Sequence, residues 1–195
     1  MDSSVRKTQE VYSYKDYLTW PDEERWEIID GIAYNMSPSP SDIHQDIFRE
    51  LFLELGNYFR GKKCKVYGAP FDVILPLNQI DDDSKIYNIV QPDIIIVCDK
   101  NKISHKGCKG SPDIVIEIVS PSTASKDFIK KRRLYEKNKI KQYWIVSPEE
   151  RTFLLFKLNE NEHYGEPEEY RKEDKFEVES FEGLEIDLSK IFQEI

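Results

Sequence analysis

The sequence reads VQPDIIIV at residues 90–97, PDIVIEIVSPS at residues 112–122, and then a basic run from Lys126 to Lys141. The first two stretches are continuous apolar runs bounded by turn residues, which predicts two strands that are covered on both faces. Each strand contains one carboxylate, Asp93 or Glu117, where burial alone favours an apolar side chain. A carboxylate there costs on the order of several kcal/mol unless it is paired, hydrogen-bonded or bound to a cation. We therefore interpret Asp93 and Glu117 as the ligands of a metal site.

The neighbouring segments complete a predicted α/β core. Downstream, residues 124–138 predict a helix and residues 142–146 a buried strand, so that strand, helix and strand form one unit. Upstream, apolar residues recur at helical spacing over residues 41–59. Residues 63–76 predict one long strand, or two joined at residues 68–70, and residues 89–98 predict one continuous strand. The expected core is therefore a helix, three strands, a helix and a strand around a mixed central sheet.

Short elements are predicted on both sides of this core. A capped helix is expected at residues 13–19, and a hairpin at residues 26–36 turns at Asp30-Gly31, because Asp-Gly supplies the positive φ of a two-residue turn. The C-terminal part predicts strands at residues 151–158, 168–172, 176–179 and 184–186 and a helix at residues 188–192. We expect a single domain over residues 1–195, with an N-terminal helix and hairpin (11–40), the core (41–148) and an acidic β-rich extension (149–195).

The composition is 39% hydrophobic, 12% aromatic and 33% charged, as is typical of a soluble globular protein. No stretch approaches the roughly 18 apolar residues of a membrane helix, and the N-terminus lacks the apolar centre of a signal peptide. We therefore expect a cytoplasmic protein with no membrane partner. The three cysteines, Cys64, Cys98 and Cys108, lack metal-binding spacing, and we expect free thiols rather than a disulfide or a zinc site.

The formal net charge is −9, which disfavours indiscriminate binding to nucleic acid, but the charge is uneven. Residues 149–195 hold 15 acidic and 6 basic side chains, whereas residues 1–148 hold 22 of each. Eight lysines and arginines crowd into residues 126–141. This run predicts either a solvated helix face or a local surface for the phosphates of DNA.

The two strand carboxylates define a specific chemistry. Side chains alternate across a strand, so neighbouring strands can bring Asp93 and Glu117 to one point. Two adjacent carboxylates repel each other unless a cation lies between them, and oxygen ligands suit Mg²⁺ or Mn²⁺. Such an ion activates water and offsets the negative charge that develops when a phosphodiester is cleaved.

Several motifs together resemble a known family. They are Pro92-Asp93, Glu117-x-Val119, the hairpin from Trp26 to Gly31, His44-Gln45, and Lys131 with Tyr135. The first two resemble the PD-(D/E)xK nuclease superfamily, and the whole set looks like the Uma-type restriction endonuclease family over residues 12–148. The resemblance implies a restriction-endonuclease-like fold and a divalent-metal-dependent endodeoxyribonuclease.

The resemblance also implies roles for individual residues. The superfamily places a lysine two residues after the glutamate, where this chain has Val119. The Uma-type family is similar in placing its lysine on the following helix, here at Lys131. Glu27 and His44 match positions of the family pattern and are expected as additional ligands or water-positioning groups. Simpler alternatives stay open, namely an exposed hairpin residue for Glu27 and a hydrogen-bonded core residue for His44.

Two of these assignments have rivals in the sequence. Asp113 also follows a proline and competes with Asp93, and Lys130 competes with Lys131 for the catalytic role. Gln91 and Ser120 are candidates for groups that orient the ligands. The basic side chains expected at DNA phosphates are Lys126, Lys130, Arg132 and Arg133, and binding through them should weaken with salt.

Together these inferences predict a metal-dependent endonuclease-like phosphodiesterase that acts on DNA, with Mg²⁺ or Mn²⁺ as its cofactor. A homodimer is expected because cleavage of both DNA strands needs two active sites. Two alternatives remain. One is a non-catalytic protein of the same fold that binds nucleic acid or a partner chain, and the other is a metal-dependent nucleotide phosphohydrolase.

Overall fold

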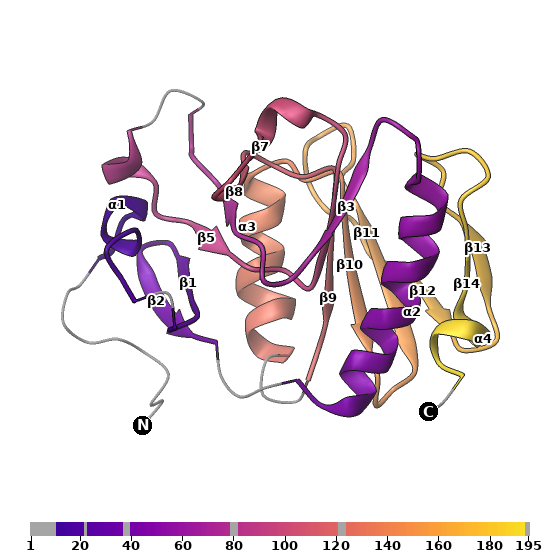
Figure 1. Ribbon diagram of the computed structural model, residues 1–195. Helices are drawn as coiled ribbons and strands as arrows, with labels where there is room; N and C mark the ends of the chain where they lie inside the picture. Colours follow the sequence, from indigo (N-terminus) through magenta and orange to yellow (C-terminus); the bar gives the residue numbers. More distant parts are fainter. Residues whose placement is uncertain (1–10, 22, 37–39, 79–81, 121–123, 194–195) are drawn as a thin grey trace.

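The computed structural model describes residues 11–21, 23–36, 40–78, 82–120 and 124–193, and its centre is a six-stranded mixed sheet (Figure 1). The strand order is β12 (Glu168–Arg171), β11 (Thr152–Lys157), β10 (Gln142–Ser147), β9 (Ile114–Ile118), β6 (Ile94–Val97) and β3 (Lys65–Gly68). β9 and β10 are parallel, and every other neighbouring pair is antiparallel. The predicted α/β class with a mixed central sheet is confirmed.

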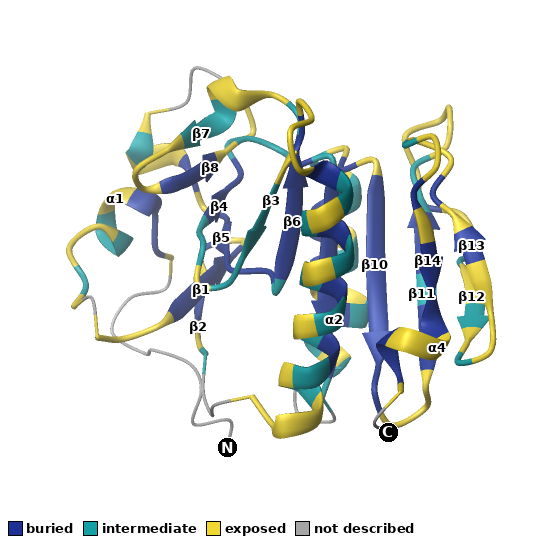
Figure 2. Ribbon diagram, turned by 45° about the vertical axis from the view of Figure 1, so that its right-hand side comes forward, coloured by how far each residue is buried: buried dark blue, intermediate teal, exposed yellow. Residues whose placement is uncertain are grey.

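Each face of this sheet is covered by a helix (Figure 1), and strands such as β6 and β10 between the two layers are buried (Figure 2). α2 (Asp42–Phe59) begins after Ser41, which caps it, and packs its buried stripe against Ile94, Ile96 and the alternate residues of β9. α3 (Arg132–Lys137) packs on the opposite face, against Ile95 and Val115. Because successive strand residues face opposite layers that are both covered, the two strands are apolar on both faces except at Glu117.

The helix that connects β9 to β10 has an irregular first half. Residues 126–131 form a π-helical segment, η3 (Lys126–Lys131), which continues directly into α3. The sequence predicts the position of this helix but not its π-helical geometry. Insertions of this kind are frequent at functional sites, because they change the direction in which side chains leave the helix.

A second six-stranded sheet packs beside the first. Its strands run in the order β2 (Ile32–Asn35), β1 (Trp26–Ile29), β5 (Ile89–Val90), β4 (Val73–Ile74), β8 (Gly107–Lys109) and β7 (Ile103–Ser104). The predicted hairpin of β1 and β2 is present, and Asp30 and Gly31 both have positive φ values, 49° and 80°. The pair β7 and β8 lies in residues 99–111, where the sequence analysis did not predict strands.

The expectation of one continuous strand over residues 89–98 is wrong at residues 91–93. β5 belongs to the second sheet and β6 to the central sheet, so the chain passes from one sheet to the other between them. Pro92 cannot donate a ladder hydrogen bond, which explains why strand pairing stops there. For residues 63–76 the second alternative is correct, since they form two strands, β3 and β4, on either side of residues 69–72.

The remaining elements lie at the ends of the chain and in connections. They are α1 (Tyr14–Tyr17), which Ser13 caps, the short turns η1 (Asp83–Lys85) and η2 (Lys100–Lys102), the two-stranded sheet of β13 (Lys175–Glu177) and β14 (Glu185–Asp187), and α4 (Leu188–Ile191). Ile186 and Leu188 pack into the same cluster as α2, so the C-terminal part extends the core. Within the described residues, no helix is both long and apolar enough to cross a membrane.

The cysteine prediction is wrong for two of the three residues. Cys64 and Cys98 form a disulfide with a Cα–Cα distance of 3.9 Å, and Cys108 is a buried free thiol. The antiparallel pairing of β3 with β6 places Lys65 opposite Val97. The neighbouring residues, Cys64 before Lys65 and Cys98 after Val97, are therefore also brought opposite each other. Sequence spacing could not reveal this, because the pairing joins segments that are 34 residues apart.

Candidate active site

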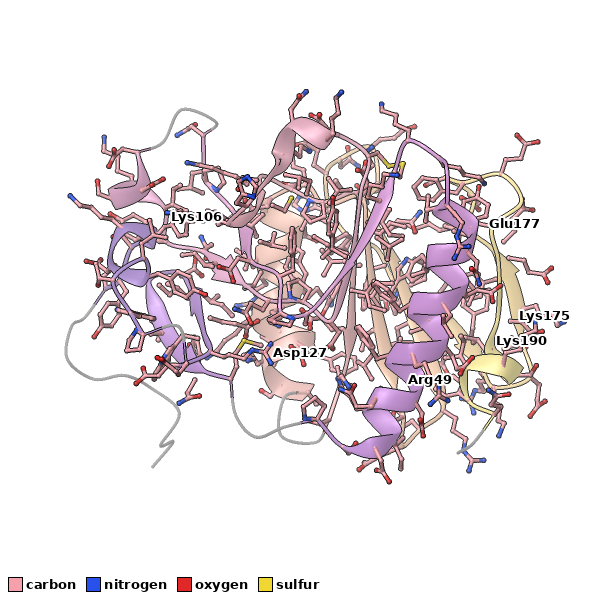
Figure 3. The ribbon with its side chains drawn as sticks, viewed as in Figure 1. Arg49, Lys106, Asp127, Lys175, Glu177 and Lys190 are labelled. Carbon is pink, nitrogen blue, oxygen red and sulfur yellow. A yellow bond between two sulfur atoms is a disulfide. The ribbon has the colours of Figure 1, made fainter. Side chains whose placement is uncertain are left out.

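Lys131 is the centre of a buried cluster of charges between the two sheets. Its Nζ lies 2.8 Å from Oε1 of Glu117 and 2.7 Å from Oε1 of Glu27. Asp127, labelled in Figure 3, lies one helical turn before Lys131, and its Oδ1 is 3.6 Å from the same nitrogen. The side chains of Lys131, Glu27 and Glu117 are each at most 5% exposed. One ammonium group therefore contacts carboxylates from a strand of each sheet and from its own helix.

Local structure explains how these groups meet. Glu117 is in β9 and shares the face of Val115, which is the face that the helix formed by η3 and α3 covers. On that helix, Tyr135 follows Lys131 by four residues, and its hydroxyl donates to Glu117 Oε1 at 2.7 Å. Glu27 is in β1 of the hairpin and is fully buried, so the alternative of an exposed hairpin residue is wrong.

Glu27 is held by three donors. Lys126 lies 2.7 Å from its Oε2, Lys131 contacts its Oε1, and the backbone N–H of Gln91 donates to Oε1 at 3.1 Å. Burial opposes the charged form of this carboxyl group, but the nearby charges of Lys131 and Lys126 outweigh burial and lower the pKa of Glu27 to about 2. Glu27 is therefore an anion at neutral pH.

Glu117 has the opposite behaviour. Burial is the largest influence and, together with the negative charges of Asp127, Asp93 and Glu27, it raises the pKa of Glu117 to about 8 despite the ammonium of Lys131. Burial also opposes the charge on Lys131, but the surrounding carboxylates raise its pKa well above the ordinary value. Of the two glutamates in contact with Lys131, Glu117 is therefore the one that holds a proton more readily.

Asp93 lies next to this cluster, at the start of β6. In the antiparallel pairing of β6 with β9, Ile94 lies opposite Ile116, so the same register places Asp93 opposite Glu117. Its Oδ2 accepts the backbone N–H of Ile118 at 2.8 Å and lies 3.3 Å from Nε2 of His44 on α2. Its charge contributes to the raised pKa of Glu117, which places the two acids within electrostatic range.

The structure separates each predicted residue from its rival. Lys131 contacts Glu117, whereas its rival Lys130 donates to the hydroxyl of Tyr34 at 2.7 Å. Asp113 lies at the other end of β9, where its carboxylate accepts hydrogen bonds from the backbone N–H of Cys98 and from the ammonium group of Lys141. Nε2 of His44 lies 3.3 Å from Oδ2 of Asp93, so the environment of His44 is polar on one side. The catalytic roles of these residues stay predictions.

The basic residues predicted to contact DNA have different surroundings. Lys126 is paired with Glu27, and the guanidinium of Arg132 lies 4.7 Å from the centre of the Phe156 ring. Lys130 and Arg133 are exposed. The sequence analysis did not assign Asp127 to the site; its position four residues before Lys131 was the available signal.

The cluster as a whole has an excess of negative charge. It contains the carboxylates of Glu27, Asp93, Glu117 and Asp127 and the ammonium groups of Lys126 and Lys131. In the part of the chain that the structure describes, no three His, Cys, Asp or Glu side chains are gathered as a preformed set of metal ligands.

Comparisons with known proteins agree with this fold. The model of the Uma2 family, described as "Putative restriction endonuclease", matches residues 14–189. The Synechocystis protein "Uncharacterized protein slr1290" is 26% identical over 184 residues, which cover 93% of this chain and 91% of that protein. A crystal structure from Anabaena variabilis, described as "a putative nuclease belonging to DUF820", superposes with a TM-score of 0.73 at 18% identity, over 93% of this chain and 97% of that one.

Proposed function

Because this chain belongs to the Uma2 family of restriction-endonuclease-like proteins, we propose that it is a metal-dependent endonuclease-like phosphodiesterase that acts on DNA. The observation that carries the proposal is the contact of Lys131 with Glu117 at 2.8 Å, beside Asp93. An ammonium group in contact with one carboxylate and within electrostatic range of a second supplies components that a phosphodiester-cleaving site needs.

The negative charge of the cluster fits a divalent cation. With Glu117 ionised, four carboxylates face two ammonium groups, and a cation of charge +2 would offset the difference; because the pKa of Glu117 is raised to about 8, binding of the cation would release its proton. Mg²⁺ is commonly bound by only one or two protein carboxylates, with water and substrate phosphate as its other ligands. Asp93 and Glu117 are the residues that would hold it. Lys131 and Tyr135 both contact Oε1 of Glu117, so neither uses Oε2.

The chain's own residues have distinct proposed roles. Bound Mg²⁺ or Mn²⁺ would supply a more acidic water and a positive charge near the phosphate. Lys131 stabilises the negative charge that develops on the phosphoryl oxygens. Glu27 fixes the ammonium of Lys131 through a 2.7 Å contact, and His44 fixes the carboxylate of Asp93. Tyr135 holds Glu117 in place through its hydroxyl.

DNA is the proposed substrate, and its backbone would meet the exposed part of the basic helix. Lys130 and Arg133 are exposed there, and Arg132 lies on Phe156. Lys126 pairs with Glu27, so a contact with phosphate requires it to leave or share that carboxylate. Because such contacts release counterions, affinity for DNA should fall steeply as salt is raised.

We also propose a homodimer, because cleavage of both strands needs two sites, and a cytoplasmic location. The Cys64–Cys98 disulfide argues against the second point, since disulfides are rare in the cytosol. Analytical ultracentrifugation tests the dimer, and a sedimentation coefficient of a monomer at assay concentration contradicts it. Detection of the protein only outside the cytosolic fraction contradicts the location.

A plasmid-nicking assay tests the function directly. Supercoiled DNA should be nicked with Mg²⁺ or Mn²⁺ and left intact with EDTA, and Asp93→Asn and Glu117→Gln should each abolish nicking. Asp113→Asn is the matched control, because Asp113 is a carboxylate at the other end of β9. Nicking by either site variant at the wild-type rate refutes the site. Hydrolysis of free nucleotides with intact DNA identifies the protein instead as a nucleotide phosphohydrolase.

The non-catalytic alternative has one observation in its favour. The strand position at which the superfamily carries its lysine is Val119, which is apolar and buried. However, Lys131 on the following helix places an ammonium group 2.8 Å from Glu117, so the site has a lysine although the strand position does not. DNA binding without cleavage under any metal condition would support the non-catalytic protein.

A further inference from the structure

A groove of about 540 Å³ lies on the second sheet, outside the charge cluster. Its walls come from α1 and the segment that leads to β1, from the chain just before β4, and from the turn between β7 and β8. The turn includes Lys106, which is labelled in Figure 3 at the β7–β8 side of the molecule. Pockets that hold small organic ligands have volumes of about 300–1,000 Å³, so the groove has the size of a binding site.

Aromatic rings provide much of the groove's surface. Tyr17 and Trp20 pack edge to face with ring centres 5.6 Å apart, and Phe71 stacks on Tyr67 at 4.6 Å. Tyr17, Trp20 and Phe71 line the groove and are all partly exposed. Their rings are held in place by other rings while part of each surface stays accessible. Such surfaces suit a flat ligand that stacks.

A fixed polar group lies among these rings. Oδ1 of Asp72 accepts hydrogen bonds from Nε2 of Gln91 at 2.8 Å and from the hydroxyl of Tyr17 at 3.1 Å. Arg25 donates to Oε1 of Gln91 through Nε and Nη2, at 3.0 and 2.9 Å. A carboxylate has about four acceptor positions and a guanidinium has five N–H groups, so both residues keep capacity for a ligand.

The backbone also holds Asp72 firmly. Its carbonyl accepts the N–H of Cys108 at 2.8 Å, and Gly107 packs so closely against this carbonyl that a Cβ would overlap it. Gly107 also has a φ of 122°, which side-chain-bearing residues rarely adopt. The position of the carboxylate is therefore set before any ligand binds.

One residue connects this groove to the charge cluster. The side chain of Gln91 lies in the groove between Arg25 and Asp72, and its backbone N–H donates to Oε1 of Glu27 at 3.1 Å. Glu27 in turn contacts Lys131. A ligand in the groove would therefore be adjacent to the residues proposed to act on a phosphodiester.

We propose that the groove is a subsite for one unpaired nucleobase of the substrate. The base stacks on the aromatic rings of the groove, Asp72 accepts hydrogen bonds from the N–H groups of the base, and Arg25 donates to the acceptor atoms of its ring. The proposal rests on the proposed function, since it names the part of a nucleic acid that lies next to the cleavage site. Asp72 and Arg25 offer an acceptor and donors side by side, which complements the mixed edge of a base rather than a phosphate. Exposed Lys106 at the rim suits the adjoining backbone.

A binding measurement in EDTA tests the subsite independently of cleavage. The probe is a DNA duplex with a fluorescent label and a three-nucleotide single-stranded extension, and the comparison is the same duplex with an abasic extension. Removal of the bases should weaken binding about tenfold or more for the wild type, because one stacked base contributes on that order. Equal affinity for the two probes overturns the subsite.

Variants locate the effect on the protein. Phe71→Ala and Asp72→Asn should each reduce the preference for the base-bearing extension to less than about threefold, with circular dichroism as the check on folding. Phe52→Ala is the matched control, since Phe52 is also partly exposed and stacks on another ring, Phe48, at 5.5 Å. An unchanged preference in folded Phe71→Ala and Asp72→Asn overturns the assignment to this groove, as does its equal loss in Phe52→Ala.

The two proposals fail in different ways. Metal-dependent nicking of plasmid, combined with equal binding of the two extensions, overturns the subsite and leaves the nuclease assignment in place. Base-dependent binding without cleavage of any polynucleotide supports the subsite and removes the nuclease assignment. Failure to bind either extension overturns the subsite.

Discussion

The raised pKa of Glu117 predicts an unusual dependence of stability on pH. A group whose pKa is higher in the folded state than in the unfolded state binds its proton more tightly when folded. The stability that it contributes is therefore fully present below the ordinary pKa of 4.5 and is lost as the pH rises through about 8. The wild-type protein should become less stable over this window on account of Glu117 alone.

Glu117→Gln isolates this contribution. The glutamine resembles the neutral carboxyl group, so the variant and the wild type should have similar free energies of unfolding near pH 5. A difference of about three to four pKa units corresponds to about 4 to 5 kcal/mol, and Glu117 is too deeply buried for solvent to screen much of it. From pH 5 to pH 9 the variant should therefore become more stable than the wild type by about this amount.

Urea unfolding followed by circular dichroism at each pH measures the difference. Glu136→Gln is the control, because the pKa of Glu136 is lowered and its ionisation is complete throughout this range. Parallel pH profiles for Glu117→Gln and the wild type would refute the electrostatic account of the cluster. If the metal proposal is also right, Mg²⁺ should stabilise the wild type most at high pH and should have little effect on Glu117→Gln.

Three further predictions follow from single contacts. Lys131→Met should abolish cleavage and lower the free energy of unfolding by about 3 to 5 kcal/mol, because it leaves Glu27 and Glu117 buried with one cation fewer. The control, Lys130→Met, should change the free energy of unfolding by less than about 1 kcal/mol. Equal effects of the two variants in urea unfolding would contradict this prediction. The pKa of Glu27 is lowered to about 2, so its stabilising contribution of about 3 kcal/mol should be present above pH 4.5 and lost as the pH falls towards 2. Over the same range, the difference in free energy of unfolding between the wild type and Glu27→Gln should shrink. A difference that stays constant with pH would contradict this prediction. Replacing Cys64 and Cys98 by serine should lower the free energy of unfolding, measured by thermal unfolding, by about 2 to 4 kcal/mol, because the disulfide closes a loop of 34 residues. Dithiothreitol should destabilise the wild type but not the serine variant. Equal sensitivity of the two proteins to dithiothreitol would contradict the presence of the disulfide.

The sequence predicts those parts of the fold that depend on local pattern. The stripe of α2, the Asp-Gly turn of the first hairpin and the continuous apolar runs of β6 and β9 all follow from side-chain periodicity and turn chemistry. These elements place Asp93 beside one apolar strand, Glu117 in the next and Lys131 on the helix that follows. The sequence therefore predicts the components of the candidate site, whereas the adjacency of the two strands comes from the pairing of β6 with β9.

Long-range pairing determines what the sequence could not predict. The burial of Glu27 depends on how the hairpin packs against the helix, which no local pattern encodes. The disulfide depends on the register of β3 with β6, and the contact of Lys126 with Glu27 joins residues 99 positions apart. A strong helical pattern likewise conceals the π-helical segment, because the same residues are compatible with either hydrogen-bond spacing.

The passage of the chain from one sheet to the other connects the two halves of the candidate site. Within residues 91–93, Gln91 binds Glu27 through its backbone and Asp72 through its side chain, and Asp93 begins the central sheet beside Glu117. A ligand that moves Gln91 must therefore change the surroundings of Glu27, and through Glu27 those of Lys131. The residue that breaks the strand pairing, Pro92, limits how far Gln91 and Asp93 can move independently, because its ring fixes one backbone angle. Gln91 thus contacts both the groove and the charge cluster, and a base that displaced it would remove the backbone hydrogen bond that Glu27 accepts.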